Sequence, residues 1–561
     1  MRKKWVQKKI SEEKILEIKN KYNISSLLSR FLLSRDVKEE YINKYLEPSL
    51  EDLKDPFLMK DMRKTVDRIK LALDNKEKIT IFGDYDVDGV TSINILMSFL
   101  LELGAKVDYY LPDRLEEGYG LNKDALKSIS EKGTTLVITV DCGISAVDEV
   151  DYANSLGLDV CITDHHECPE VLPRSYAILN AKQKDCTYGF TMFAGVGVAF
   201  KLISALAKDY NLEKESYLKY LDIAALGTIS DIVPLVDENR VIAKFGVEKI
   251  KTTNNLGLKA LIKTAGYKQV DSTMVSFGLA PRINACGRMG DASLAVKLFF
   301  ADNMEKATEI AKQLEAQNRQ RQEIEKKIYD EALALIQKDK LNEKSIIILG
   351  HEGWHHGVIG IVASKLTDLY VKPVVLLTFE GEVGKGSGRT PFGFSLFDAL
   401  KECKEHVIQF GGHEVAAGLT VEKSKFEEFK KALEKVADEK IVKEFEQIID
   451  IDAEIYKKDL CKQTLIDINK IRPFGQSNKE PIFVYKKLVV HSVRTIMEGK
   501  HLKMVLKDGN ALIDTIAFGM GNRRDEIVVG QKIDVACNVG INNYGNAKKI
   551  QLIIKDFIKS V

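Results

Sequence analysis

Three aspartates stand at alternate positions in Asp84-Tyr85-Asp86-Val87-Asp88. They follow an apolar segment that predicts a strand and precede a segment that predicts a helix. Carboxylates this close together raise one another's pKa, and a hard divalent cation is the usual remedy. The pattern indicates a cation site, with a solvated acidic turn as the alternative. An EF-hand is a third possibility, but the helix follows too soon and no Glu occupies the twelfth loop position.

The elements that must position these aspartates are predicted by alternating apolar and amphipathic segments. Strands are predicted at residues 79–82, 107–111, 136–140 and 160–163. Helices are predicted between them, at about residues 91–103, 123–132 and 146–156. Strands and helices that alternate with short links predict a mostly parallel sheet covered on both faces.

Acidic and imidazole side chains follow three of these strands. Asp84 follows the first strand, Asp141 the third, and the run Asp164-His165-His166 the fourth. Because the carboxyl ends of parallel strands share one edge of the sheet, we expect these groups to meet there. Asp231 stands alone in an apolar segment, either as a further member of this group or as a helix cap.

Such a group of side chains suits two-metal chemistry. Two Asp/His clusters that share a carboxylate hold two ions about 3.5–4 Å apart, which activate a water and stabilise both oxygens of an in-line displacement. Oxygen-rich ligands with one or two imidazoles favour Mn²⁺ or Mg²⁺ over a structural zinc. The natural reaction is phosphoester hydrolysis, which needs no Ser or Cys nucleophile, and the chain has no Walker A motif.

The composition fits a soluble, multidomain protein. The chain has 561 residues, of which 45% are hydrophobic and 29% charged. We expect a cytoplasmic location, because Met1–Trp5 opens no signal-peptide-like segment, no segment could span a bilayer, and the eight scattered cysteines form no CxxC pair. Residues 451–561 hold 19 Lys and Arg against 12 Asp and Glu, so this tail carries +7 in a chain of net charge +1. That asymmetry suggests a polyanion contact at the C-terminus, with an evenly solvated surface as the alternative.

The remaining patterns predict the domain organisation. A polar, breaker-free stretch at 304–338 predicts one helix about 50 Å long that bridges two domains. The last 110 residues alternate apolar and polar positions between Gly/Asn turns, as in a small barrel. We therefore predict an N-terminal helical segment (1–60), a catalytic domain (61–303), a connecting helix (304–343), a second α/β domain (344–450) and a barrel domain (451–561).

Several motifs carry a family resemblance. Gly83–Gly89, Val140–Gly143, Asp164–His166 and Asp231–Leu235 resemble the four motifs of the DHH phosphoesterase superfamily. The later Phe410–His413 and Ala416–Gly418 resemble the signature of its associated DHHA1 domain. Within this superfamily the chain resembles the RecJ exonucleases, and three further segments support that choice: Pro281–Met289, Trp354–Ser364 and Arg472–Gly475. The resemblance implies a DHH parallel-sheet domain and a smaller DHHA1 domain joined by a long helix, followed by an OB-like barrel.

The resemblance also implies roles at the catalytic centre. Five residues are expected to bind two Mn²⁺ or Mg²⁺ ions, with Asp141 bridging: Asp86, Asp88, Asp141, His165 and Asp231. Asp84 is expected to support these ligands or join them. His166 is expected to contact the scissile phosphate, or alternatively to orient a carboxylate, and Asp164 to hold the following turn or a ligand histidine.

Other motif residues are expected to hold the substrate. Gly384–Thr390 is expected to form a glycine-rich phosphate loop in which Arg389 grips a phosphate. Arg114 is expected to cap a terminal 5′ phosphate, with a surface ion pair as its alternative, and Trp354 to stack on a base, with core packing as its alternative. The full set of expected substrate-binding residues is Arg114, Arg282, Asn284, Arg288, Trp354, His355, Ser387, Arg389, Gly411, Gly412 and His413. On the barrel, candidates include Tyr485 and Lys486.

Taken together, the resemblance implies a processive 5′→3′ exonuclease that acts on single-stranded DNA in repair and recombination. It also implies cooperation with single-strand-binding protein and a RecQ-type helicase, and no membrane partner. Two alternatives stay open. One is a DHH phosphodiesterase for short oligonucleotides, cyclic dinucleotides or pyrophosphate, which would not need the basic barrel. The other is a non-catalytic replication scaffold of DHH ancestry, a class that tends to lose metal ligands, whereas every expected ligand position is filled here.

Overall fold

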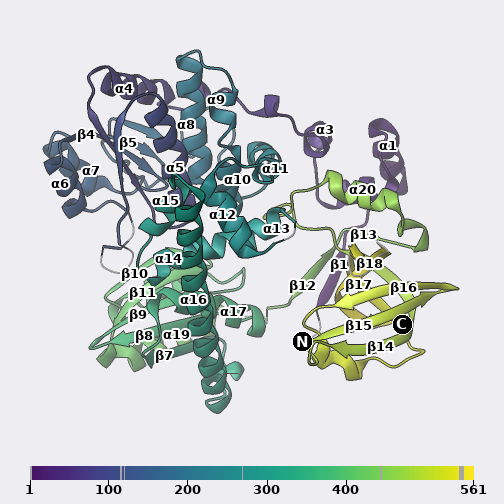
Figure 1. Cartoon of the computed structure of the whole chain (residues 1–561). Coiled ribbons are helices and arrows are strands. Elements are labelled where there is room, and N and C mark those ends of the chain that lie inside the picture. The colour runs from purple at the N-terminus through teal and green to yellow at the C-terminus, as the bar shows by residue number, and fades with distance from the viewer. Residues whose placement is uncertain are drawn as a thin grey trace.

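The structure is a computed structural model that describes residues 3–113, 117–118, 120–267, 269–441, 445–542 and 549–560. Its catalytic domain is built on a sheet of five parallel strands in the order β3-β2-β4-β5-β6 (Figure 1). The strands are β2 (Lys78–Gly83), β3 (Lys106–Tyr110), β4 (Thr134–Val140), β5 (Asp159–Thr163) and β6 (Ala177–Leu179). The predicted parallel sheet is confirmed.

Helices cover both faces of this sheet, because its strands are apolar on both sides. Ile79, Ile81 and Ile138 face a large core shared with α5, α8 and α10, whereas Phe82 and Val137 face a smaller core under α6 and α7. The helices of this domain are α4 (Met62–Asp74), α5 (Val87–Glu102), α6 (Lys123–Glu131), α7 (Val147–Ser155), α8 (Gly195–Asp209), α9 (Glu215–Leu218), α10 (Leu221–Ser230), α11 (Asp237–Ile250), α12 (Leu256–Ala265), α13 (Ser272–Met274), α14 (Ala280–Met289) and α15 (Ser293–Phe299).

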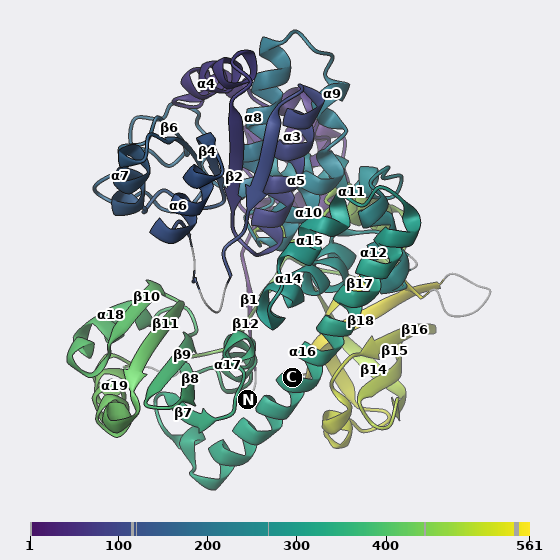
Figure 2. The same ribbon diagram turned by 60° about the vertical axis from the view of Figure 1, so that its left-hand side comes forward.

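The predicted long helix is confirmed as α16 (Met304–Lys338), which runs from the catalytic domain to a second domain (Figure 2). That domain has a mixed sheet in the order β10-β11-β9-β8-β7. Its strands are β7 (Ile347–Glu352), β8 (Val374–Glu380), β9 (Val383–Arg389), β10 (Gln409–His413) and β11 (Ala416–Glu422). Helix α17 (His356–Tyr370) packs with α16 on one face, and α18 (Leu396–Glu402) and α19 (Phe426–Lys440) pack on the other.

The C-terminal domain is a closed five-stranded barrel, in which β14 pairs with both β15 and β17 and so joins the two edges of the sheet. Its strands are β14 (Phe483–Ile496), β15 (His501–Asp508), β16 (Ala511–Ala517), β17 (Lys532–Asn542) and β18 (Lys549–Lys559), and the short β12 (Ile448–Ile451), β13 (Ala453–Glu454) and helix α20 (Lys462–Lys470) precede them. The predicted barrel is confirmed.

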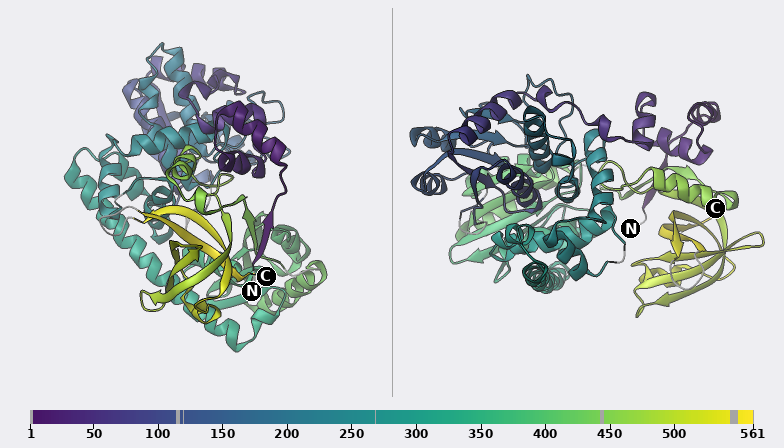
Figure 3. Two further views of the ribbon diagram at one scale, coloured as in Figure 1. Left: turned by 90° about the vertical axis from the view of Figure 1, so that its right-hand side faces the viewer. Right: turned by 45° about the horizontal axis from the view of Figure 1, so that its top comes forward.

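The N-terminal segment differs from the prediction. The predicted helices are present as α1 (Glu12–Tyr22), α2 (Ser26–Ser34) and α3 (Ile42–Leu46), but the chain first forms a strand, β1 (Lys4–Gln7), parallel to β12. Trp5 Nε1 donates to Asp556 Oδ2 (2.8 Å), and Arg35 forms an ion pair with Asp452. Strand β1 and helix α2 therefore pack with the barrel and the segment that precedes it, and Figure 3 shows the N-terminal segment beside the barrel. No helix among the described residues is long and apolar enough to cross a membrane.

Candidate active site

Three neighbouring strands deliver acidic and imidazole groups to one edge of the parallel sheet. Asp84 directly follows β2, Asp141 follows β4, and Asp164-His165 follows β5. These strands are adjacent in the order β2-β4-β5, so their carboxyl ends lie side by side. The predicted convergence of these side chains is confirmed.

Asp86 and Asp88 are held by the N-termini of two helices. Asp86 caps α5, where its Oδ1 accepts from the backbone N–H groups of Asp88 (2.8 Å) and Gly89 (3.1 Å). The buried Asp88 carboxylate accepts from the N–H groups of Gly195 (2.6 Å) and Val196 (2.7 Å), which open α8. Unpaired N–H groups and the helix dipole stabilise an anion at such a position.

Asp141 occupies the centre of the site in a left-handed conformation, with φ of 61°. Left-handed backbone at a non-glycine residue is typical of functional positions whose surroundings enforce it. Gly195 packs directly against this side chain, since a Cβ atom on Gly195 would lie 2.8 Å from Asp141 Oδ1. Only glycine leaves room there.

His165 connects the carboxylates. Its Nε2 lies 3.0 Å from Asp141 Oδ1, 3.7 Å from Asp231 Oδ2 and 3.8 Å from Asp88 Oδ2. Three groups of side chains place one potential ligand atom each within 4.8 Å of one another: Asp84, Asp86 and Asp141; Asp88, His165 and Asp231; and Asp141, His165 and His166. The first two groups form two neighbouring ligand sets, and Asp141 and His165 each occur twice.

The electrostatics of the site favour a bound cation. Burial and the charge of Asp86 raise the pKa of Asp88 to about 7, and burial with the charges of Asp88 and Asp86 raises the pKa of Asp231 to about 9. Burial and the neighbouring aspartates also raise the pKa of Asp141 well above its ordinary value. Burial and the charge of His166 lower the pKa of His165 to about 4, which leaves its imidazole neutral and able to ligate. Oxygen-rich donors with one imidazole fit Mn²⁺ or Mg²⁺.

Asp164 organises the turn that carries the histidines. Its Oδ2 accepts from Ile144 N–H (2.9 Å), and its Oδ1 accepts from His165 N–H (2.7 Å) and lies 2.7 Å from His166 Nδ1. Burial alone would raise the pKa of Asp164, but the hydrogen bond and charge of His166 outweigh it and lower the pKa. Asp164 therefore orients His165 and His166 and lies outside the three ligand groups.

The segment Gly384–Thr390 is a strand up to Arg389, so the predicted phosphate loop is wrong. Residues 383–389 form β9, which pairs with β8 on one side and β11 on the other, and this pairing occupies the backbone N–H groups that a phosphate loop would offer. Alternation along the strand places Gly386 in the core and Ser387 and Arg389 on the side of α17, where Gly360 packs against both.

An open strand face results, formed by Ser387, Arg389, Gly411, His413 and Gly418. In register across β9, β11 and β10, Ser387 lies opposite Gly418 and Gly418 opposite Gly411, while Arg389 and His413 flank Ala416. These residues are exposed or half-buried. Four of the predicted substrate residues thus share one surface, whereas Gly412 alternates to the other side.

Helix α14 contains three predicted substrate residues that all have protein partners. Arg282 Nε donates to Glu315 Oε2 (2.6 Å), and Asn284 Oδ1 accepts from Val87 N–H (3.2 Å) at the start of α5. Arg288 Nη1 donates to Gly357 O (2.9 Å) at the N-terminus of α17. Helix α14 therefore links the Asp86–Asp88 turn to the second domain.

Two aromatic side chains that were predicted to contact the substrate are in the core. Trp354 is 4% exposed and its Nε1 donates to Glu331 Oε2 (2.9 Å), so its side chain is not available to a nucleobase. Tyr485 is 3% exposed, with its hydroxyl on Asp508, and Lys486 pairs with Glu454. His355 is half-buried and accepts from Gly357 N–H through Nδ1 (3.1 Å), as a cap of α17. Arg114 lies outside the described residues.

Three supporting residues were missed from the sequence. Gly195 and Val196 anchor Asp88, and the buried Asn180, just after β6, donates from Nδ2 to His166 O (2.9 Å). Asn180 directly follows the short strand β6, just as Asp84, Asp141 and Asp164 directly follow their strands. This position at a strand end was the signal in the sequence that could have identified it.

Comparison with known families covers most of the chain. Residues 78–228 match the DHH family N-terminal domain, residues 343–439 the DHHA1 domain, and residues 451–556 the RecJ OB domain. The single-stranded-DNA-specific exonuclease RecJ of Bacillus subtilis is 40% identical over 99% of this chain and 70% of the relative. The protein of the same name from Haemophilus influenzae is 33% identical over 99% of this chain and 100% of the relative.

Solved structures agree with this assignment. RecJ from Thermus thermophilus in complex with Mn²⁺ superposes with a TM-score of 0.87 at 27% identity, over 100% of this chain and 80% of that one. The same protein in complex with Mg²⁺ gives a TM-score of 0.80 at 26% identity, over 100% and 79% of the two chains. The chain matches the three domain models, is similar to RecJ relatives over almost its whole length, and has an Asp or His at every expected metal-ligand position. It therefore belongs to the RecJ family of the DHH superfamily.

Proposed function

We propose that this protein is an exonuclease that hydrolyses single-stranded DNA from the 5′ end with two Mn²⁺ or Mg²⁺ ions. The observation that carries the proposal is the meeting of Asp84, Asp141 and His165, from three strand ends, with Asp86, Asp88 and Asp231 in ligand groups that share Asp141 and His165. Relatives named single-stranded-DNA-specific exonuclease RecJ support the choice of substrate.

The ligand groups suggest how the ions would be held. Asp84, Asp86 and Asp141 would hold one ion, and Asp88, His165 and Asp231 the other, with Asp141 between them. Two such ions supply an activated water and stabilise the charge that develops on the scissile phosphate. Asp88 is fixed by the N-terminus of α8, which keeps this carboxylate in place before substrate arrives.

His166 is suited to contact the phosphate. Its Nδ1 is engaged with Asp164, so Nε2 is the ring nitrogen that would donate to a phosphate oxygen. Asp164 is in turn fixed by Ile144 N–H, and this chain of contacts sets the ring orientation.

The open strand face would guide the strand toward the metal site. A Cβ atom on Gly411 would have no neighbour within 4 Å, one on Gly418 would lie 3.9 Å from its nearest neighbour, and neither residue has a positive φ. Neither packing nor backbone conformation therefore demands glycine at these two positions. A nucleic-acid backbone that approaches the sheet closely does explain them. Arg389 belongs to the same open strand face and would bind a phosphate of the DNA.

A single strand would fit this route better than a duplex, because helix α14 binds both the catalytic turn and the N-terminus of α17 and so would hold the two domains together there. Arg114 is our candidate for the terminal 5′ phosphate. The barrel belongs to a class of folds that bind single strands, which favours long substrates over dinucleotides.

Family membership also favours a cytoplasmic role in DNA repair and recombination, with a RecQ-type helicase that supplies single strands and a single-strand-binding protein that coats them. Co-purification of tagged protein from its host, with and without nuclease treatment, tests these partners.

The function is tested with single strands labelled at the 5′ or the 3′ end, incubated with Mn²⁺, Mg²⁺ or EDTA, beside blunt duplex and RNA. We expect early release of the 5′ label as a nucleotide, no reaction in EDTA and little cleavage of duplex. Equal cleavage of duplex and single strands, or earlier release of the 3′ label, would overturn the proposal.

A further inference from the structure

Asp231 differs from the other proposed ligands in how it is held. Asp86 and Asp88 each accept two backbone N–H groups, and Asp141 follows a central strand. Asp231 instead ends α10, and the chain leaves that helix through Ile232 in a left-handed conformation, with φ of 59°. Such a conformation is a genuine outlier for a β-branched residue and persists only where the surroundings enforce it.

Hydrogen bonds from two parts of the protein hold the residues that follow Ile232. Asn239 Nδ2 donates to Pro234 O (3.0 Å) from the catalytic domain. From the other side, Leu235 N–H donates to Gln476 O (2.9 Å), so the chain leading from Asp231 is fastened to the segment that precedes the barrel.

A tight turn, Gly475–Asn478, provides that second fastening. Gly475 and Asn478 bond to each other through both backbone pairs (3.0 and 3.2 Å), and Asn478 Nδ2 donates to Ile471 O (2.9 Å) and Pro473 O (2.7 Å). Gly475 lies against the buried Leu235, where an added Cβ atom would stand 2.6 Å from Leu235 Cδ1. The φ of Gly475 is ordinary, so the expected effect of a larger residue here is that it displaces the buried Leu235 side chain.

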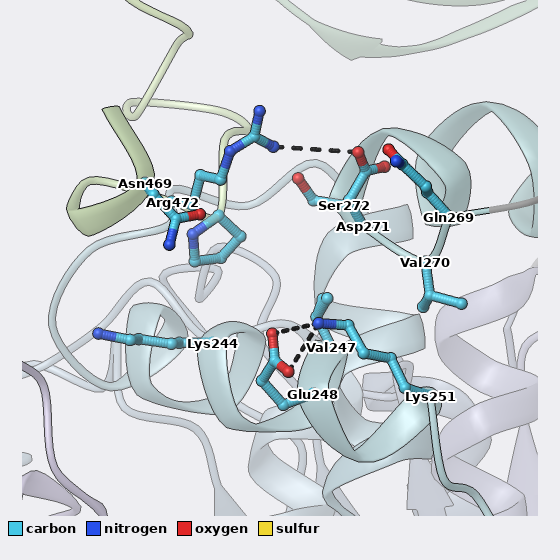
Figure 4. A pocket seen from close by; sticks show the side chains of 11 residues that line it. Lys244, Val247, Glu248, Lys251, Gln269, Val270, Asp271, Ser272, Asn469 and Arg472 are labelled. Atoms are coloured by element: carbon cyan, nitrogen blue, oxygen red, sulfur yellow. Dashed lines mark hydrogen bonds and ion pairs between the residues drawn. The ribbon is translucent and has the colours of Figure 1, made fainter. Parts of the chain in front are cut away.

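A buried arginine of the catalytic domain binds the segment that leads into the turn. Arg240 is 2% exposed and donates to Tyr45 O (2.8 Å), Ile471 O (3.2 Å), Lys470 O (3.3 Å) and Arg472 O (3.1 Å). The packing beside Arg240 is loose, because a crevice of about 830 Å³ lies between residues 469–473 on one side and residues 244–251 and 269–272 on the other (Figure 4). Arg472 reaches across this crevice toward Asp271, with 3.9 Å between the guanidinium and the carboxylate (Figure 4).

We propose that the Gly475–Asn478 turn is a positioning element for Asp231, and that Gly475 is the positioning residue within it. The turn that leads into the DNA-binding barrel thus sets the place of one metal ligand. This inference rests on the proposed metal site and extends it to residues with no ligand atom of their own.

The test is Mn²⁺ binding to the full-length protein without DNA, by titration calorimetry and by electron paramagnetic resonance of free Mn²⁺. In Gly475→Ala we expect one of the two ions to bind about tenfold more weakly, with the other unchanged. We also expect kcat on single strands to fall about tenfold with little change in KM, and excess Mn²⁺ to restore it. Gly540→Ala in the barrel is the matched control and should match wild type, because its Cβ would meet only the end of Ile553 at 3.2 Å.

A second substitution separates positioning from damage to the fold. Leu235→Val removes the Cδ atoms that the Cβ added at position 475 would strike, so Gly475→Ala combined with Leu235→Val should recover Mn²⁺ affinity. Asn478→Ala, which loosens the turn without adding an atom, should weaken the same ion. Unchanged Mn²⁺ binding in folded Gly475→Ala would overturn the inference, as would equal loss of both ions without recovery in the double variant. Asp231→Asn separates failure of this inference from failure of the proposed metal site. If Asp231→Asn also leaves Mn²⁺ binding unchanged, the assignment of Asp231 as a metal ligand is wrong.

Discussion

His165 Nε2 lies 3.0 Å from Asp141 Oδ1, so the ends of two neighbouring strands meet at the centre of the site. Asp141 also belongs to the ligand group formed with Asp84 and Asp86, and His165 to the group formed with Asp88 and Asp231. This pair therefore joins the two proposed ion positions.

Metal-free protein should lose stability as the pH rises. An acid whose pKa is higher in the folded than in the unfolded chain destabilises the fold above its ordinary pKa of 3.8, and the penalty grows until the pH passes the folded value, about 9 for Asp231. Asp231→Asn removes this ionisation, so its melting temperature in EDTA should exceed that of wild type by a margin that widens from pH 5 to pH 9. A margin that stays constant across this range would contradict the raised pKa of Asp231. In saturating Mn²⁺, wild type should instead have the higher melting temperature.

Asp164→Asn should separate orientation from ligation. Asp164 positions both histidines and lies outside the three ligand groups, so the variant should bind Mn²⁺ in the same number. Loss of a supporting partner of this kind costs about 10–100-fold, and we expect that loss in kcat. Calorimetry and single-turnover hydrolysis measure the two effects, and loss of one bound ion would instead make Asp164 a ligand.

Gly418→Val should hinder the binding of single-stranded DNA without destabilising the fold. A side chain at 418 has space in the free protein and a branched residue suits a strand, so the melting temperature should not fall. KM for a long single strand should rise about tenfold because the valine stands on the open strand face. Lys435→Val, which places an exposed valine on α19 at the opposite face of the sheet, is the control. Equal kinetics in the two variants would exclude this face as the route.

Trp354→Ala should affect stability and leave DNA binding intact. Removing a buried tryptophan costs about 3–5 kcal/mol, measured as the free energy of unfolding in denaturant. Phe392, 84% exposed in the same domain, is the matched control, and Phe392→Ala should cost almost nothing. If folded Trp354→Ala bound single strands in EDTA much more weakly than wild type, the stacking role predicted from the sequence would regain support.

The strand ends of the catalytic domain were predictable because a parallel sheet brings its carboxyl ends together by geometry alone. Residues whose role depends on distant contacts were not. The glycines of β9 resemble a loop in sequence, but the register with β8 and β11 makes them a strand. The sequence allows Trp354 either to stack on a base or to pack in the core. Only its tertiary contacts, such as the hydrogen bond to Glu331, decide between these roles. Strand β1 is four residues long and pairs with β12, which is far away in the sequence, so no local pattern marks it.

The site is proposed to hold two ions that share Asp141. The most direct measurement is the number of Mn²⁺ ions bound per chain, without DNA, in wild type and in Asp141→Asn. We predict two ions in wild type, and in the variant a loss of affinity for both, since Asp141 lies in reach of each ligand group. One ion in wild type, or two ions bound with unchanged affinity in Asp141→Asn, would contradict the account.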